Sequence, residues 1–325
     1  MPHARSARSA RSVRSARNAR RRALRTAGAG VVVVAVAVGG VVLLLQQTTP
    51  QAAPRQDCTA ALDGATWRLS PAQADNAALI TAVSLRREMP ARAATIALAT
   101  ALQESKLVNI DYGDRDSVGL FQQRTSQGWG TVEEIMDPVF STNAFFDGLE
   151  KVPGYTELPV TEAAQAVQRS GFPDAYAQHE VRSRAWAAGL TGQNQASVVC
   201  TLTEADPVAA GDPAAIASAR ATLSERVARD FGDLAITEQG AASIVVDVTS
   251  LAPTSDDVGR LAWALAQWGV ASAQATGVES VTVGGHVWSR DDGTWSTDQI
   301  GAETSDGEGA PTLAESSVLL TLAVR

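Results

Sequence analysis

The chain has 325 residues, enough for about two domains, and its 27 basic and 35 acidic side chains give a formal charge of −8. Nine arginines and no acidic residue lie in residues 1–25, so the rest of the chain is strongly acidic. Phosphate contacts need clustered Lys and Arg, so this composition predicts that nucleic acid is not a partner. With two cysteines, three histidines and no phosphate-binding glycine motif, the sequence predicts no metal site and no cofactor.

Residues 1–26 form an arginine-rich repeat without an apolar stripe, so they cannot bury a core. We expect a basic, disordered cytoplasmic tail here. Its arginines either contact anionic lipid, at ~1 kcal/mol for each arginine near the surface, or serve only as a topology signal.

Residues 27–45 contain no polar side chain and are long enough, as a helix, to cross the ~30 Å hydrocarbon core of a bilayer. The arginine-rich flank precedes this segment, so the positive-inside rule predicts a single-pass signal-anchor helix in the cell membrane, with the N-terminus in the cytoplasm. The bulk of the chain is then extracytoplasmic. A cleaved signal peptide is the alternative, although its apolar segment is usually only ~7–15 residues long.

A polar, proline-containing linker is expected at residues 46–57, followed by a first domain over residues 58–203. Cys58 and Cys200 lie near the two ends of this domain and outside the membrane in the predicted topology. Disulfides form in oxidising compartments, so the pair predicts a bridge that ties the ends of one domain together. The alternative is two unpaired thiols.

This first domain is predicted to be helical. Residues 70–73 have a capping-box pattern that starts a helix running to about residue 88. The next helix, over residues 91–105, is apolar nearly all round until its last turn, which predicts burial.

Glu104 lies in the last turn of that apolar helix. Partial burial and the negative end of the helix dipole both raise the pKa of a carboxyl group at this place. A glutamic acid that is protonated near neutral pH is what acid-catalysed cleavage of a glycosidic bond needs. A solvated Glu104 paired with Lys106 is the alternative.

Three sequence elements follow in order. Ser105 comes directly after Glu104, and Gly-Leu-Phe-Gln begins fifteen residues after Glu104, at Gly119. The third element contains Asp137, Pro138, Asn143, Gly148 and Leu149. This order resembles the lysozyme-like superfamily, with soluble lytic transglycosylases, goose-type lysozymes and resuscitation-promoting factors as the most similar groups. The resemblance covers residues 95–150 best and implies an α-helical lysozyme-like domain that cleaves peptidoglycan.

The resemblance also implies roles for individual residues. Glu104 would be the general acid, and Ser105 would support an N-acetyl group of the substrate or order the loop. Gly119 and Leu120 would form the floor opposite Glu104, and Gln122 would face a sugar.

Three loop acids, Asp111, Asp114 and Asp116, offer a second carboxylate, with Asp111 and Asp116 as the candidate catalytic residues. A carboxylate ~6.5–9.5 Å from Glu104 would activate water for an inverting hydrolysis. Without one, the family's other route remains, in which the substrate's own 6-hydroxyl attacks and leaves a 1,6-anhydro sugar. Loop capping is the alternative role for each of the three acids.

One stretch departs from the family pattern. Transglycosylases usually carry an Ala-Tyr-Asn-Ala-Gly-like stretch that lines the cleft, whereas residues 166–171 read Ala-Val-Gln-Arg-Ser-Gly. The Tyr and Asn are missing, and Gln168 is the candidate polar residue of the cleft. This difference leaves open a domain that binds glycan without cleaving it.

Aromatic rings are candidates for stacking on sugars. Trp129 lies between two glycines in a predicted loop, and we expect it to form a wall of the cleft. Phe172 and Tyr176 are further candidates, although core packing is the more common place for an aromatic ring.

A linker at residues 204–212 and a small α+β domain over residues 213–325 complete the chain. The predicted order of helices and strands favours one sheet with helices on one face, and no catalytic constellation is found there. The predicted elements are helices at residues 213–231 and 255–275 and strands at residues 243–249, 278–284, 286–290 and 316–324, with a hairpin into residues 294–295.

Two functions fit these patterns. The first is a membrane-anchored, extracytoplasmic glycosidase, either a muramidase or a lytic transglycosylase, that cleaves peptidoglycan with Glu104 as its general acid. The second is an anchored cell-wall-binding or scaffold protein on a catalytically inactive lysozyme-like core. In both, the expected partners are peptidoglycan glycan strands and, through residues 27–45, the membrane. The sequence indicates no particular protein partner.

Overall fold

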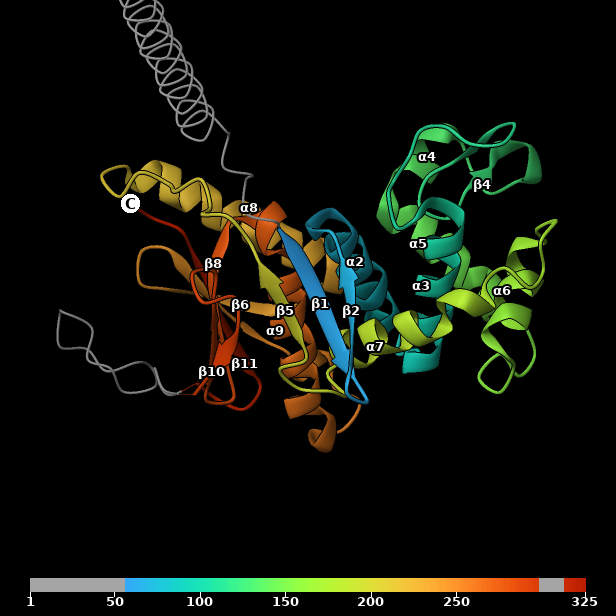
Figure 1. The fold of residues 1–325 in the computed structure, drawn as a ribbon. Helices are drawn as coiled ribbons and strands as arrows, with labels where there is room; N and C mark the ends of the chain where they lie inside the picture. Colours follow the sequence, from blue (N-terminus) through green and yellow to red (C-terminus); the bar gives the residue numbers. More distant parts are fainter. Residues whose placement is uncertain (1–55, 298–312) are drawn as a thin grey trace, which may run out of the picture. The chain divides into compact units, whose positions relative to one another are not determined.

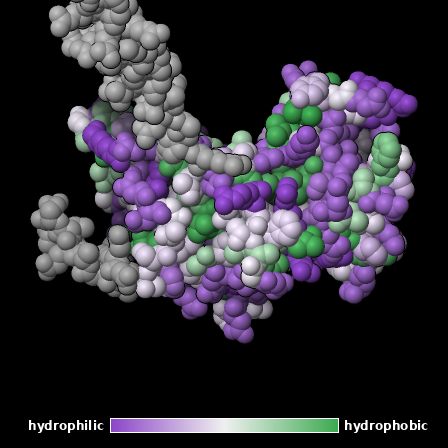
Figure 2. Space-filling view, in the orientation of Figure 1, coloured by the Kyte–Doolittle hydropathy of each residue, from purple (hydrophilic) through white to green (hydrophobic). Residues whose placement is uncertain are grey.

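The computed structural model describes residues 56–297 and 313–325, which belong to one compact unit, Pro54–Arg325 (Figure 1). The predicted tail at residues 1–26 and the predicted anchor at residues 27–45 lie outside the described residues. Among the helices that are described, none has both the length and the apolar character needed to cross a bilayer. Hydrophilic residues predominate on the face shown in Figure 2, and hydrophobic residues appear there only in small patches.

The first half of the described chain is built from helices, a three-stranded antiparallel sheet in the order β2-β1-β5, and the separate hairpin β3-β4. Its elements in chain order are β1 (Asp57–Leu62), β2 (Ala65–Leu69), α2 (Pro71–Arg86), α3 (Ala91–Ser105), β3 (Ser117–Val118), β4 (Gln123–Arg124), η1 (Thr125–Gln127), α4 (Val132–Met136), α5 (Pro138–Leu149), α6 (Val160–Gln168), η2 (Ala177–His179), α7 (Glu180–Leu190) and β5 (Val198–Thr201).

The first two predicted helices are confirmed. The capping box is present at the start of α2, where the Ser70 hydroxyl accepts a hydrogen bond from the Gln73 backbone and the Gln73 side chain accepts one from the Ser70 backbone. Helix α3 is buried from Ala93 to Leu102, as its apolar sequence predicts. Only the last turn of α3 brings a carboxylate, that of Glu104, to partial exposure.

The second half contains one six-stranded antiparallel sheet in the order β10-β9-β8-β11-β7-β6. The predicted helices and strands are confirmed, but β6 was not predicted, because this edge strand is largely exposed and has a polar sequence. The elements are α8 (Pro213–Phe231), β6 (Ala235–Gln239), β7 (Ser243–Asp247), η3 (Thr249–Leu251), η4 (Ser255–Asp257), α9 (Val258–Thr276), β8 (Val278–Val283), β9 (His286–Ser289), β10 (Trp295–Ser296) and β11 (Ser317–Leu322).

The two halves share one hydrophobic core. Helix α2 packs against α9, and a single cluster of buried side chains includes Ile80 of α2 with Leu265 and Trp268 of α9. On its other side, α2 packs against α3 and α5. The segments predicted as two domains are therefore in direct contact. Helix α2, which packs against α3, is itself supported by α9 of the second half.

A buried charged cluster reinforces this contact. Asp230 of α8 is fully buried, and it accepts hydrogen bonds from Arg226 at 3.0 Å, from Arg229 at 2.7 Å and from the indole nitrogen of Trp268 at 2.8 Å. Arg226 also pairs with Asp75 of α2, at 2.5 Å. Burial raises the pKa of Asp75, and the charge of Arg226 opposes that rise. Because a buried charge needs a partner, these contacts fix α8 against both α2 and α9.

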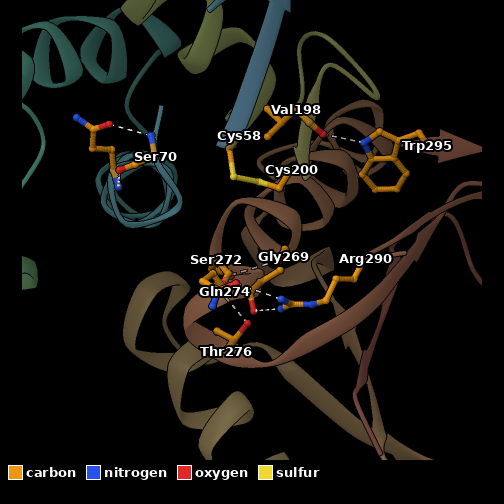
Figure 3. Close-up of a disulfide and its surroundings, with 12 residues drawn as sticks. Cys58, Ser70, Val198, Cys200, Gly269, Ser272, Gln274, Thr276, Arg290 and Trp295 are labelled. Carbon is orange, nitrogen blue, oxygen red and sulfur yellow. Dashed lines mark hydrogen bonds between the residues drawn. A yellow bond between two sulfur atoms is a disulfide. The ribbon is translucent and has the colours of Figure 1, made fainter. Parts of the chain in front are cut away.

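The predicted disulfide is confirmed. Cys58 of β1 is bonded to Cys200 of β5, its register partner on the neighbouring strand (Figure 3). The indole nitrogen of Trp295 donates a hydrogen bond to the carbonyl oxygen of Val198, at 2.9 Å, so the strand that carries Cys200 also contacts the second half (Figure 3). The guanidinium group of the buried Arg290 caps the end of α9 by donating to the carbonyl oxygen of Ala273, at 2.6 Å.

We expect the double substitution Cys58→Ala/Cys200→Ala to lower the free energy of unfolding by about 2–5 kcal/mol, because the bridge joins strands 142 residues apart and restricts the unfolded chain. Urea unfolding followed by circular dichroism measures this change. Reductant should lower the stability of the wild type in the same way and leave that of the double variant unchanged. Equal unfolding curves for both proteins without reductant would contradict the stabilising role.

Candidate active site

The candidate site is centred on Glu104, in the last turn of α3. Its Oε1 accepts a hydrogen bond from the phenol of Tyr176, at 2.6 Å, and one from Nε2 of Gln168, at 3.3 Å. Oε2 accepts no hydrogen bond from the described residues and is not among their enclosed, unpartnered atoms. One oxygen of the carboxyl group is therefore held by the protein, while the other is left available.

Burial raises the pKa of Glu104 above its ordinary value, and the hydrogen bonds from Tyr176 and Gln168 oppose that rise. The desolvation of the charged form is the larger effect, so the net direction is upward. The alternative in which Glu104 pairs with Lys106 does not occur, because Lys106 is the left-handed C-cap of α3 and forms no ion pair with Glu104. The carboxyl group thus has the environment expected of a general acid.

Tyr176 is fully buried, and its phenol points at Glu104. Burial and the neighbouring carboxylate both raise the pKa of Tyr176, so the phenol keeps its proton and remains a hydrogen-bond donor. Tyr176 was a candidate for stacking on a sugar, but its ring is buried and its phenol supports Glu104. Phe172, four residues earlier, is 76% exposed, so its ring lies on the surface whereas that of Tyr176 does not.

The segment that carries Tyr176 is attached to α3 by polar contacts next to Glu104. Oε1 of Gln103 lies 3.1 Å from Nε2 of Gln178 and 3.1 Å from Nε2 of His179. Burial lowers the pKa of His179, with a further contribution from the charge of Arg182, so the ring is neutral at neutral pH and donates through Nε2. These contacts fix η2 beside the end of α3.

Ser105 contacts the loop that follows α3. Its hydroxyl is buried and lies 2.7 Å from the carbonyl oxygen of Leu120 and 3.1 Å from that of Ala101. Gln168 reinforces the same loop by donating to the carbonyl oxygen of Phe121, at 2.7 Å. The Gly-Leu-Phe-Gln turn is therefore held against Glu104 through its backbone.

The structure places the side chains of that turn differently from the expectation. Leu120 is fully buried, so its side chain is part of the core and does not form a floor for a sugar. Phe121 is also buried and stacks on Phe145, with 4.6 Å between the ring centroids. Gly119 is required, because its φ is +80° and an added Cβ would lie 2.8 Å from the carbonyl oxygen of Ile135.

Gln122 is partly exposed, and its Nε2 donates to the carbonyl oxygens of Tyr112, at 3.2 Å, and Gly119, at 3.4 Å. The amide group therefore supports the neighbouring loop. Tyr112 itself is 70% exposed, so the loop that Gln122 orders presents an aromatic ring to solvent.

The three loop acids differ in their contacts. Asp116 accepts hydrogen bonds from Nε of Arg124, at 2.8 Å, and from the backbone and hydroxyl of Ser126, which lower its pKa far below the ordinary value. Asp114 lies 3.8 Å from Arg115. Asp111 is exposed on the loop. The contacts of Asp116 join β4 to η1, which fits the loop-capping alternative for this residue.

Trp129 lines a pocket of about 760 Å³ between α5, α6 and the loop after η1. Gln168 lines the same pocket and also contacts Glu104, at 3.3 Å. The role of Trp129 as a wall of the glycan cleft stays a prediction. Among the described residues, no group of three His, Cys, Asp or Glu side chains is arranged as a metal site requires.

No family model matches the chain, and no curated protein has a significant sequence match to it. The case for a function therefore depends on the site itself.

We expect the substitution Tyr176→Phe to raise the pKa of Glu104 further, because it removes a hydrogen bond to the charged form while burial is retained. The protonated fraction of Glu104 at neutral pH should then increase. The titration of the carboxyl carbon by NMR measures this shift. Tyr155→Phe, a matched change at a tyrosine that does not contact Glu104, should leave the titration unchanged. A downward shift in Tyr176→Phe would contradict the assigned contact.

Proposed function

We propose that this protein is a membrane-anchored, extracytoplasmic glycosidase that cleaves the glycan strands of peptidoglycan, with Glu104 as its general acid. The observation that supports this proposal is a half-buried carboxyl group, raised in pKa, with protein donors on one oxygen only. The membrane anchor and the compartment rest on the apolar sequence of residues 27–45 and its arginine-rich flank.

The donor arrangement determines where the catalytic proton resides. Tyr176 and Gln168 both donate to Oε1, so this oxygen acts as an acceptor and a proton on Glu104 is better accommodated on Oε2. Oε2 is the oxygen without a described protein donor. Transfer of its proton to the glycosidic oxygen would neutralise the leaving group as the bond from that oxygen to the sugar C1 breaks.

The second half of the reaction is proposed to use the substrate's own 6-hydroxyl. The oxygen of this hydroxyl attacks C1 of its own sugar, the sugar whose C1 bond to the glycosidic oxygen breaks. The hydroxyl proton passes to the Glu104 carboxylate, so that Glu104 is a carboxylic acid again. This route needs no second carboxylate. Asp116, one of the candidate second carboxylates, is already bound to Arg124 and Ser126, which supports this route over inverting hydrolysis through that residue.

The alternative is a wall-binding or scaffold protein that does not cleave glycan. The pocket lined by Trp129 favours this alternative, since a glycan bound there requires no chemistry at Glu104. It predicts co-sedimentation with peptidoglycan without turnover. The experiments below separate the two functions.

We expect Glu104→Gln to lower the release of muropeptides from purified peptidoglycan at least about a hundredfold, because the amide cannot supply a proton. Its thermal melting curve should match that of the wild type, since Tyr176 and Gln168 can still contact the amide oxygen. Glu157→Gln, at an exposed site on the loop before α6, is the matched control and should remain fully active. Full activity of Glu104→Gln would rule out the assigned role.

Mass spectrometry of the released fragments should find 1,6-anhydro ends, which lack one water relative to hydrolysis products. Asp111→Asn and Asp116→Asn should both keep this product, although Asp116→Asn should lower stability by loosening the hairpin β3-β4. Reducing ends in place of anhydro ends, together with loss of activity in either variant, would support inverting hydrolysis instead.

A further inference from the structure

The pocket beside the candidate site has features that the cleavage reaction does not use. It has apolar and aromatic walls, to which Trp129 and Phe140 contribute. A Cβ added at Gly148 would lie 2.9 Å from Cγ1 of Val167 and 3.7 Å from the ring of Trp129, so the glycine lets α5 approach α6 and the indole closely. The walls are thus formed by two helices and a loop packed on one another.

A single residue, Gln168, links this pocket to Glu104. Gln168 lines the pocket, and its Nε2 lies 3.3 Å from Oε1 of Glu104. Gln168 therefore contacts both the pocket and the carboxyl group, on the side of α6.

The pocket carries positive charge in an acidic chain. Lys151 and Arg169 both line it, and both are exposed and form no ion pair with a described acidic residue. The lining carboxylate, Asp147, is paired with Arg87 at 2.7 Å, so it does not neutralise them. Most other arginines of the described residues form ion pairs with acidic side chains. Two cations without such a pair on one pocket are therefore unusual in this protein, and they favour an anionic ligand.

We propose that this pocket binds the peptide stem of peptidoglycan, with Lys151 and Arg169 contacting its carboxylates. The proposal rests on the proposed function and specifies its substrate as glycan strands that still carry their stems. In peptidoglycan every second sugar carries a stem, so a stem lies within one sugar of each cleavable bond. The methyl groups of its alanine residues suit the apolar walls, and its carboxylates suit the two cations.

A glycan strand without stems carries only one lactyl carboxylate on every second sugar, whereas a stem brings several carboxylates and its alanine methyl groups to one place, which suits two cations beside apolar walls. An anionic polymer attached to occasional sugars would leave most bonds without a ligand for the pocket. The stem is the anionic group whose spacing along the strand matches a pocket fixed beside a single carboxyl group.

Binding is tested with the full-length protein in mild detergent, in the Glu104→Gln background, so that turnover does not interfere. The probes are fluorescent glycan strands with intact stems and the same strands after removal of the stems by an amidase. Lys151→Gln/Arg169→Gln should weaken binding of stem-bearing strands about fivefold, as expected for two exposed ion pairs, and the loss should shrink at high salt. Stem-free strands, which keep only one lactyl carboxylate on every second sugar, should lose clearly less affinity, about twofold or less.

The matched control is Arg68→Gln/Arg184→Gln, which makes the same change in net charge at exposed arginines that do not line the pocket. It should leave both affinities unchanged. Equal loss for the two kinds of strand, or no loss for either, would overturn the stem proposal. Failure of the wild-type protein to cleave either strand would instead overturn the proposed function, and the binding measurement would still decide whether the pocket recognises stems.

Discussion

The hydrogen bond from the phenol of Tyr176 to Oε1 of Glu104 joins the two segments on which the candidate site depends. Glu104 comes from the end of a helix buried along most of its length, and Tyr176 comes from the irregular segment before η2. Two effects act on the carboxyl group in opposite directions, since burial raises its pKa and the donors lower it. Burial is the larger effect, so the group combines a fixed orientation with a raised affinity for its proton.

The rest of the molecule keeps α3 in place. Helix α2 packs against both α3 and α9, so the second half of the chain supports the helix that carries Glu104, and none of its described residues (213–297 and 313–325) contacts Glu104 by a hydrogen bond. The buried pair of Asp230 and Arg226 and the bridge between Cys58 and Cys200 act in the same way. Because the pKa of Glu104 depends on opposing effects of burial and hydrogen bonding, the site needs these contacts to be held in a fixed geometry.

Much of the local structure was predictable. The capping box at Ser70, the apolar run of α3 and the β-branched strand β7 each have a pattern set by neighbouring residues. The hairpin β1-β2 was missed, although Asp63-Gly64 is a recognised turn signal and both residues adopt positive φ. Ser105, the neighbour of Glu104, contacts the Gly-Leu-Phe-Gln turn through the carbonyl oxygen of Leu120, although the side chain of Leu120 lies in the core and not in a cleft.

The sequence by itself determined where the helices and strands form, which cysteines pair and that Glu104 lies at the end of a buried helix, because caps, periodicity and composition act over a few residues. Only the tertiary structure decided which groups meet that carboxyl group. Gln168 and Tyr176 are 64 and 72 residues away along the chain; the resemblance suggested Gln168 as a residue of the cleft, but nothing in the sequence around Tyr176 indicates its contact with Glu104. The same holds for Leu120, buried in the core, and for Asp116, bound by Arg124, since the roles of both depend on how the hairpin packs against its surroundings.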